Sequence, residues 1–173
     1  MTRKKGWVLA LYLFAVGILV IADQVVKRLC MLLLKPVGSV TLLDGIFALT
    51  YKENTGGAFS LLSGHRWLLI AATAVLMGIC LYLLVFSKDR HPLFLSSIAL
   101  IIAGGIGNFI DRLFRGYVVD MFEFRFVNFA VFNVADICVT VGVALLAVYI
   151  LFVHRADKDG EKHGGHAEDS ADC

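Results

Sequence analysis

Four stretches of the chain contain no charged residue, and each fits one membrane-spanning helix. They are residues 7–22, 67–87, 92–110 and 137–153. The first keeps its apolar character as far as residue 34. Because a helix needs about 20 residues to cross a bilayer core of about 30 Å, we predict four transmembrane helices. The predicted helices occupy about residues 7–34, 67–87, 92–111 and 134–154.

The first helix has a second interpretation, because the basic residues Arg3, Lys4 and Lys5 precede it as in a cleaved signal peptide. Its apolar run exceeds the usual signal-peptide core of about 7–15 residues, and three more apolar stretches follow. We therefore expect the helix to be retained. The basic residues at both termini, with Lys88 and Arg90 in the turn between helices 2 and 3, then predict that both termini are cytoplasmic.

The composition agrees with a membrane protein. Of the 173 residues, 59% are apolar and 17% are charged, whereas soluble domains have about 45–50% and about 25%. This difference argues against a soluble enzyme. We predict one integral membrane domain over residues 1–156 and a polar, disordered tail over 157–173. His163 and His166 lie in that tail, where we expect disorder and not a metal site.

The two long connections, at about 35–66 and 111–136, carry strand-like patterns. Residues 41–51 are β-prone and contain a glycine turn. In 122–126 phenylalanines alternate with Glu123 and Arg125, which is the period of a strand with one apolar face. Aromatic residues are typical of the membrane interface. Both connections are therefore predicted to be structured, on the side opposite the termini.

Ionisable residues inside or beside the apolar stretches are costly, which makes them candidates for function. Asp23 and Lys27 lie four residues apart on one face of helix 1. The simpler interpretation of this pair is a self-neutralising ion pair near the helix end. Helix 3 ends with Asn108, Asp111 and Arg112 after three closely spaced glycines that permit close helix packing.

Two further acids flank the connection between helices 3 and 4. Asn133 and Asp136 have the spacing of a capping box, so Asp136 has a structural interpretation as a helix cap. Asp120 also has a structural interpretation, as a solvated carboxylate in a loop. The alternative is that the returning connection brings the two carboxylates face to face. Such a pair shares one proton, and it activates water for hydrolysis without a serine, a cysteine or a metal.

These residues stand in motifs that resemble those of the lipoprotein signal peptidases, the bacterial type II signal peptidases. The resemblance covers about residues 7–153, and its specificity comes from five motifs in the same order. They are Asp23-Gln-Val-Val-Lys27, Asn54-Thr-Gly-Gly-Ala-Phe59, Gly104-Gly-Ile-Gly-Asn108 with Asp111-Arg112, Gly116-Tyr-Val-Val-Asp120 and Phe132-Asn-Val-Ala-Asp136.

The resemblance implies a membrane aspartic endopeptidase that cuts a prolipoprotein just before a diacylglyceryl-cysteine. It implies that Asp120 and Asp136 are catalytic, that Asn54, Asn108, Arg112 and Asn133 bind or orient, and that Asp23 and Lys27 shape the site. The implied fold is a four-helix bundle with an extracytoplasmic β-sheet cradle and a short outer helix, in the bacterial inner membrane. Gly57 and Met121 depart from the family pattern, and Asp111 is expected to act structurally.

Two other classes of function remain open from the residues alone. A small transporter or proton-conducting bundle would use the buried acids as relays, but the chain shows no convincing inverted repeat. A purely structural membrane protein would leave the convergence of acids, asparagines and an arginine unexplained. Under the peptidase hypothesis the partners are prolipoprotein signal peptides and membrane lipid. We expect a monomer that needs no cofactor or metal and binds no nucleic acid.

Overall fold

Four long helices and a small sheet make up the computed structural model, which describes residues 3–56 and 64–153. The helices are α1 (Arg3–Leu29), α2 (Arg66–Phe86), α3 (Pro92–Phe114) and α4 (Val134–Val148). Single π-helical turns, η1 (Cys30–Leu34) and η3 (Tyr149–Val153), extend α1 and α4. Within the described residues, four helical segments are long and apolar enough to cross a membrane, which confirms the prediction of four such helices.

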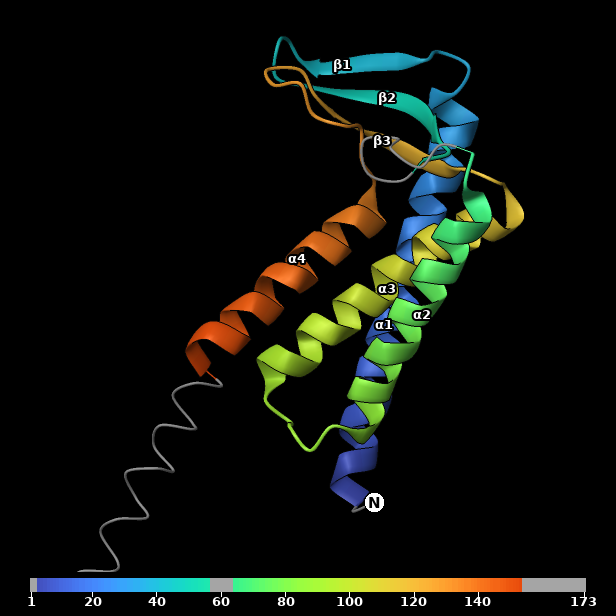
Figure 1. Cartoon of the computed structure of the whole chain (residues 1–173). Coiled ribbons are helices and arrows are strands. Elements are labelled where there is room, and N and C mark those ends of the chain that lie inside the picture. The colour runs from blue at the N-terminus through green and yellow to red at the C-terminus, as the bar shows by residue number, and fades with distance from the viewer. Residues whose placement is uncertain (1–2, 57–63, 154–173) are drawn as a thin grey trace, which may run out of the picture.

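The sheet lies at one end of the bundle. Its antiparallel strands are β1 (Ser39–Leu43), β2 (Phe47–Asn54) and β3 (Val118–Phe124), in the order β1-β2-β3. The hairpin between β1 and β2 turns at Gly45, whose φ of 69° is accessible to glycine without strain. The start of α1, the α2–α3 turn and the end of α4 all lie at the opposite end of the bundle (Figure 1).

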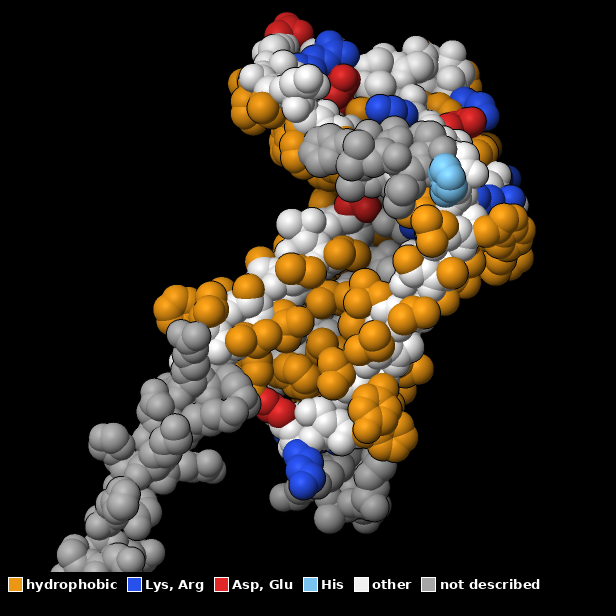
Figure 2. Space-filling model, viewed as in Figure 1, with side chains coloured by type: hydrophobic (Ala, Val, Ile, Leu, Met, Phe, Trp, Pro, Cys, Tyr) orange, Lys and Arg blue, Asp and Glu red, His pale blue; other side chains and the backbone are white. Residues whose placement is uncertain are grey.

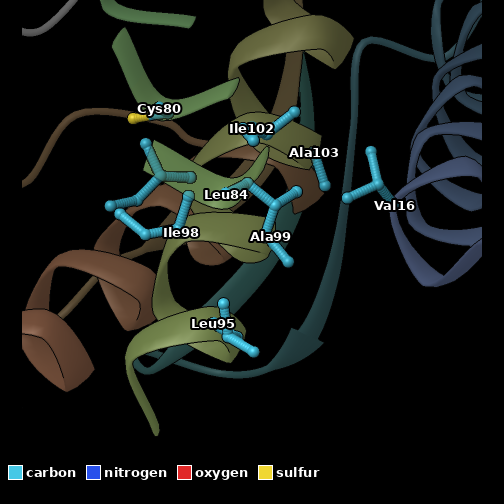
Figure 3. Close-up of a cluster of buried hydrophobic side chains, with 9 residues drawn as sticks. Val16, Cys80, Leu84, Leu95, Ile98, Ala99, Ile102 and Ala103 are labelled. Carbon is cyan, nitrogen blue, oxygen red and sulfur yellow. The ribbon is translucent and has the colours of Figure 1, made fainter. Parts of the chain in front are cut away.

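Helix α3 is the central helix of the bundle. In its most apolar stretch of 18 residues 56% are buried, whereas the corresponding share in the other three spans is 11–17%. A core of buried side chains surrounds it, in which Val16 of α1 and Leu84 of α2 pack near Ala99 and Ala103 (Figure 3). Large apolar side chains on the outer faces of the other helices are exposed, and Figure 2 shows them along α2 and α4. These faces suit contact with lipid.

Two glycines allow α3 and α4 to approach closely. A Cβ on Gly104 would clash with the backbone carbonyl of Ala135, and one on Gly142 would lie 2.9 Å from the carbonyl oxygen of Ser97. Small residues at such positions let helix backbones pack against each other in a membrane. This contact brings the first turn of α4 against the part of α3 that carries its polar residues.

The structure differs from the predictions at two places. Helix α3 continues to Phe114 and stops before Gly116, whose φ is 89°. Strand β3 begins at Val118, four residues before the predicted strand, because Val118 and Val119 already pair with the end of β2. Asp120 is therefore on a strand and not in a solvated loop. None of the described residues forms the short outer helix, and Gly57 lies outside them.

Candidate active site

Asp120 lies near the centre of β3 and is almost fully buried, with 1% of its surface exposed. Two side-chain amides donate hydrogen bonds to its carboxylate. Asn54 Nδ2 lies 2.9 Å from Oδ2, and Asn133 Nδ2 lies 2.6 Å from Oδ1. Asn54 ends β2 and Asn133 precedes α4, so three elements meet at this one carboxylate.

Asp136 is in the first turn of α4 and completes the capping box with Asn133. Its Oδ2 accepts a hydrogen bond from the backbone N–H of Asn133 at 3.1 Å, and the backbone N–H of Asp136 donates to Asn133 Oδ1 at 2.9 Å. The capping interpretation is therefore confirmed. It does not use the whole carboxylate, because Oδ1 accepts a hydrogen bond from Asn108 Nδ2 of α3 at 2.8 Å.

The asparagines connect the two acids in a continuous chain. Asn133 Nδ2 donates to Asp120 and also to Asn108 Oδ1 at 3.2 Å, and Asn108 donates in turn to Asp136. Such a chain holds both carboxylates in fixed orientations while leaving each of them acceptors for a further donor. Polar groups from β3, α3 and α4 therefore form one unit.

Burial raises the pKa of Asp120 to about 6, from an ordinary value of 3.8. The hydrogen bonds from Asn54 and Asn133 and the positive charge of Lys27 oppose this rise, and the charge of Asp136 adds to it. A carboxyl group of this kind exchanges its proton near neutral pH, as general acid–base catalysis requires.

Both acids line one cavity of about 620 Å³. Asn54, Asn108 and Arg112 line the same cavity, which extends over apolar side chains of α2, α3 and α4. Aromatic rings form part of its wall: Phe124 and Phe132 lie 5.2 Å apart between ring centroids, and Phe129 packs against both. The hollow between α2 and α4 is lined with apolar side chains on the face in Figure 2. The cavity thus combines a polar end with an apolar body.

Arg112 is half-buried at the polar end of the cavity, where its guanidinium interacts electrostatically with Asp136 and Asp120. Its backbone carbonyl accepts a hydrogen bond from Arg66 Nε at 2.6 Å, which ties the end of α3 to the start of α2. Among the described residues, its guanidinium makes no hydrogen bond to another side chain.

Asp23 and Lys27 lie behind the cavity and do not line it. Lys27 has no exposed surface, and its ammonium group contacts three partners: Asp23 at 2.9 Å, Asn108 at 3.0 Å and Asp111 at 3.1 Å. The predicted ion pair within α1 is therefore present. It is also joined to α3, and through Asn108 to Asp136, which the spacing within α1 gave no means of predicting.

A structural role was predicted for Asp111 but not its contacts, and no role was predicted for Gln24. Asp111 is fully buried, and its Oδ2 accepts a hydrogen bond from the backbone N–H of Val119 at 3.1 Å. Gln24 Nε2 donates to Asp23, to the carbonyl of Gly107 and to Asp111. A polar pair three residues apart, Gln24 and Lys27, on a face that also carries Asp23 was the available signal for Gln24.

The departure at Met121 concerns packing and not the cavity. Its side chain is 2% exposed and belongs to a buried cluster with Cys30, Leu34 and Val119, at the junction of η1 and β3. Among the described residues, no group of three His, Cys, Asp or Glu side chains is placed to hold a metal ion. His163 and His166 lie outside the described residues.

Comparison with known proteins identifies this arrangement. A sequence model of the family described as signal peptidase (SPase) II matches residues 15–152. The chain belongs to the signal peptidase II family. The lipoprotein signal peptidase of Lactobacillus johnsonii is 36% identical to it over 148 residues, which is 86% of this chain and 96% of that relative. The lipoprotein signal peptidase of Symbiobacterium thermophilum is 41% identical over 138 residues, 79% of this chain and 91% of that relative.

The fold is also shared with a solved structure. A bacterial membrane enzyme determined by the in meso method at 1.9 Å resolution matches with a TM-score of 0.75 and 28% identity, over 83% of this chain and 94% of that one. The resemblance inferred from the five motifs is thereby confirmed, as is the fold of four helices with a small sheet. The signal peptidase II family contains membrane peptidases, and the four apolar helices of this member fit that class.

Proposed function

We propose that the chain is an aspartic endopeptidase that removes signal peptides from prolipoproteins, cutting just before a cysteine that carries diacylglycerol. The observation that carries this proposal is that Asp120 and Asp136, from separate elements, line one cavity with an apolar body. The names of the relatives, lipoprotein signal peptidase, support the choice of substrate.

The proposed chemistry follows from a proton shared between Asp120 and Asp136, which we call the dyad. Two interacting carboxyl groups cannot both ionise cheaply, so one is charged and the other holds a proton at neutral pH. The charged one removes a proton from a water molecule that attacks the scissile carbonyl. The protonated one donates to the carbonyl oxygen and later to the leaving amine. The pKa of about 6 at Asp120 suits both directions of transfer, and the pair titrates as one unit.

Substrate binding uses the two parts of the cavity. The apolar walls from α2, α3 and α4 fit the apolar signal peptide and the acyl chains of the lipid. At the polar end, Arg112 and Asn54 are placed to hold backbone carbonyls near the dyad. Asn54 Oδ1 already accepts a hydrogen bond from the backbone N–H of Gly56, which fixes the amide beside Asp120.

We further propose that the protein lies in the bacterial inner membrane with both termini in the cytoplasm and the sheet at the outer face, surrounded by lipid, as a monomer. The sheet is at the end of the bundle opposite the start of α1 (Figure 1), and Asp120 lies on its strand β3. The basic residues flanking the spans at that other end support its cytoplasmic placement. Residues 1–156 would then be one membrane domain and 157–173 a cytoplasmic tail.

The test is cleavage of a synthetic prolipoprotein peptide by purified protein in detergent. A peptide with diacylglyceryl-cysteine should be cut at the bond before that cysteine, and the same peptide with unmodified cysteine should be cut far more slowly. Asp120→Asn and Asp136→Asn should each lose about 10²–10⁴-fold or more in turnover. Glu53→Gln, which alters an exposed ion pair on the sheet, is the matched control. Substantial cleavage by either aspartate variant would refute the dyad mechanism.

A further inference from the structure

Two buried carboxylates that the proposed chemistry does not use hold the backbone beside the dyad. Asp23 is 2% exposed and Asp111 is fully buried. Asp23 Oδ1 accepts a hydrogen bond from the backbone N–H of Ala135 at 3.0 Å, and Asp111 Oδ2 accepts one from Val119 at 3.1 Å. Ala135 immediately precedes Asp136, and Val119 immediately precedes Asp120. Each dyad residue thus follows a backbone amide that a buried carboxylate fixes.

Lys27 joins the two carboxylates. Its ammonium group has three N–H donors, and it contacts Asp23, Asp111 and Asn108 at 2.9–3.1 Å, so all three are used. Asp111 also forms an ion pair with Arg115 through its other oxygen. The charges of the group therefore balance inside the protein, as buried charges must. We call Asp23, Lys27 and Asp111 the Lys27 bracket.

We propose that Asp111 is a positioning residue that acts through Asp120, and that the Lys27 bracket sets the separation of the two dyad carboxylates; this inference rests on the proposed peptidase function. Asp120 is on β3 and Asp136 is on α4, so no single element fixes the distance between them. The bracket does so through α1 and α3, which hold the two backbones against one ammonium group.

The hydrogen bonds from the backbone amides of Val119 and Ala135 affect catalysis because each fixes the backbone next to a dyad residue. An aspartate side chain has only two rotatable bonds, so the backbone position largely determines where its carboxylate lies. A misplacement of about 1 Å can cost about 10²-fold in rate. Loss of the Val119 bond should therefore reduce the rate of the chemical step, while Arg112 and Asn54 still bind substrate.

The experiment compares three variants of the purified, full-length protein. Asp111→Ala removes both oxygens. Asp111→Asn keeps one oxygen for the Val119 N–H and Lys27, because its amide nitrogen can face the side where Arg115 lies. Arg115→Gln removes the ion pair at that side and the hydrogen bond from Arg115 to Gln24 Oε1, while it leaves the bond from Val119 in place, and it is the matched control. The readouts are kcat and KM for the lipidated peptide, and the fraction of enzyme that binds a peptide with a reduced, uncleavable bond.

We expect Asp111→Ala to lower kcat per binding-competent enzyme by about 30–100-fold with KM within about threefold of wild type. Asp111→Asn should recover at least about tenfold of that loss, and Arg115→Gln should stay near wild type. A purely structural role would lower only the fraction that binds the uncleavable peptide. The inference is overturned if kcat per competent enzyme is unchanged in Asp111→Ala, or if Asp111→Asn and Asp111→Ala lower this kcat equally.

A second measurement does not depend on cleavage. Hydrogen exchange at the Val119 amide should accelerate at least about tenfold in Asp111→Ala and stay unchanged in Arg115→Gln. Exchange that stays slow in Asp111→Ala contradicts the inference whatever the activity. Conversely, a wild-type protein that fails to cut the lipidated peptide but shows this acceleration refutes the proposed function and leaves the bracket in place.

Discussion

Replacing Asp120 by asparagine should make the folded protein more stable at neutral pH while removing its proposed activity. The reason is that burial raises the pKa of this carboxyl group from 3.8 to about 6. The folded state therefore holds the proton more tightly than the unfolded state does. Above pH 6 Asp120 is the charged member of the pair in the folded state and is also charged in the unfolded state, so the folded protein bears the full cost of burying that charge. Below about pH 4 it is neutral in both states, and the cost disappears.

The magnitude follows from the shift. About two pKa units at 1.36 kcal/mol each give a cost of about 3 kcal/mol at pH 7.5. Asparagine removes that cost, but its NH₂ group must face one of the donors, Asn54 or Asn133, so one hydrogen bond worth about 1 kcal/mol is lost. The net gain is about 2 kcal/mol. At roughly 2–4 °C per kcal/mol for a chain of this length, the unfolding midpoint should rise by several degrees.

The assay is thermal unfolding of wild type and Asp120→Asn in the same detergent at pH 4.5, 6 and 7.5. The difference between their midpoints should be largest at pH 7.5 and should shrink as the pH falls. Glu53→Gln is the control of opposite sign, because hydrogen bonds from Lys35 and Tyr51 lower the pKa of Glu53; this variant should gain nothing at pH 7.5. Equal midpoints at pH 7.5, or a difference independent of pH, would refute this reasoning.

Three further outcomes are expected, two from contacts in or beside the site and one from the proposed topology. Asn54→Ala and Arg112→Ala should each lower kcat/KM by about 10–100-fold, since a hydrogen bond to a charged group contributes about 1.5–3 kcal/mol; near-normal turnover in both would contradict their roles. Gly107→Ala should destabilise the fold by about 1–3 kcal/mol in thermal unfolding, because its Cβ would lie 2.5 Å from a buried carboxylate oxygen of α1, whereas Gly17→Ala has open space and serves as control. A cysteine at Asp44 should be labelled from outside intact spheroplasts; labelling only after lysis would reverse the proposed topology.

Much of this fold could be predicted because its signals are local. Uncharged runs give the helices, since the bilayer requires a minimum apolar length. The glycine turn at Gly45 gives the hairpin, and the spacing of Asn133 and Asp136 gives the capping box. Each of these features depends on residues close together in the sequence, so the local pattern is enough to predict it.

The features that were missed depend on pairing between distant segments. Val118 and Val119 precede Asp120 without alternation, so nothing local shows that β3 already begins there; its pairing with β2 decides this. Likewise, the spacing of Asp23 and Lys27 predicts a pair within α1. Only the packing of α1 on α3 shows that Asp111 shares the same ammonium group. The roles of the dyad came from the five motifs and stay proposals.

Two of the buried acids in this bundle each have a basic partner one turn later in the same segment. Lys27 lies one turn after Asp23 in α1, and Arg115, directly after the last residue of α3, lies one turn after Asp111; both pairs are in contact. The charge of Asp23 and that of Asp111 are therefore each balanced within the same segment, which lowers the cost of placing either acid in lipid. Lys27 then forms its second ion pair, with Asp111, only when α1 and α3 associate. During biogenesis we expect Lys27 to lower the cost of inserting α1 and then, once α3 is present, to favour the association of the two helices.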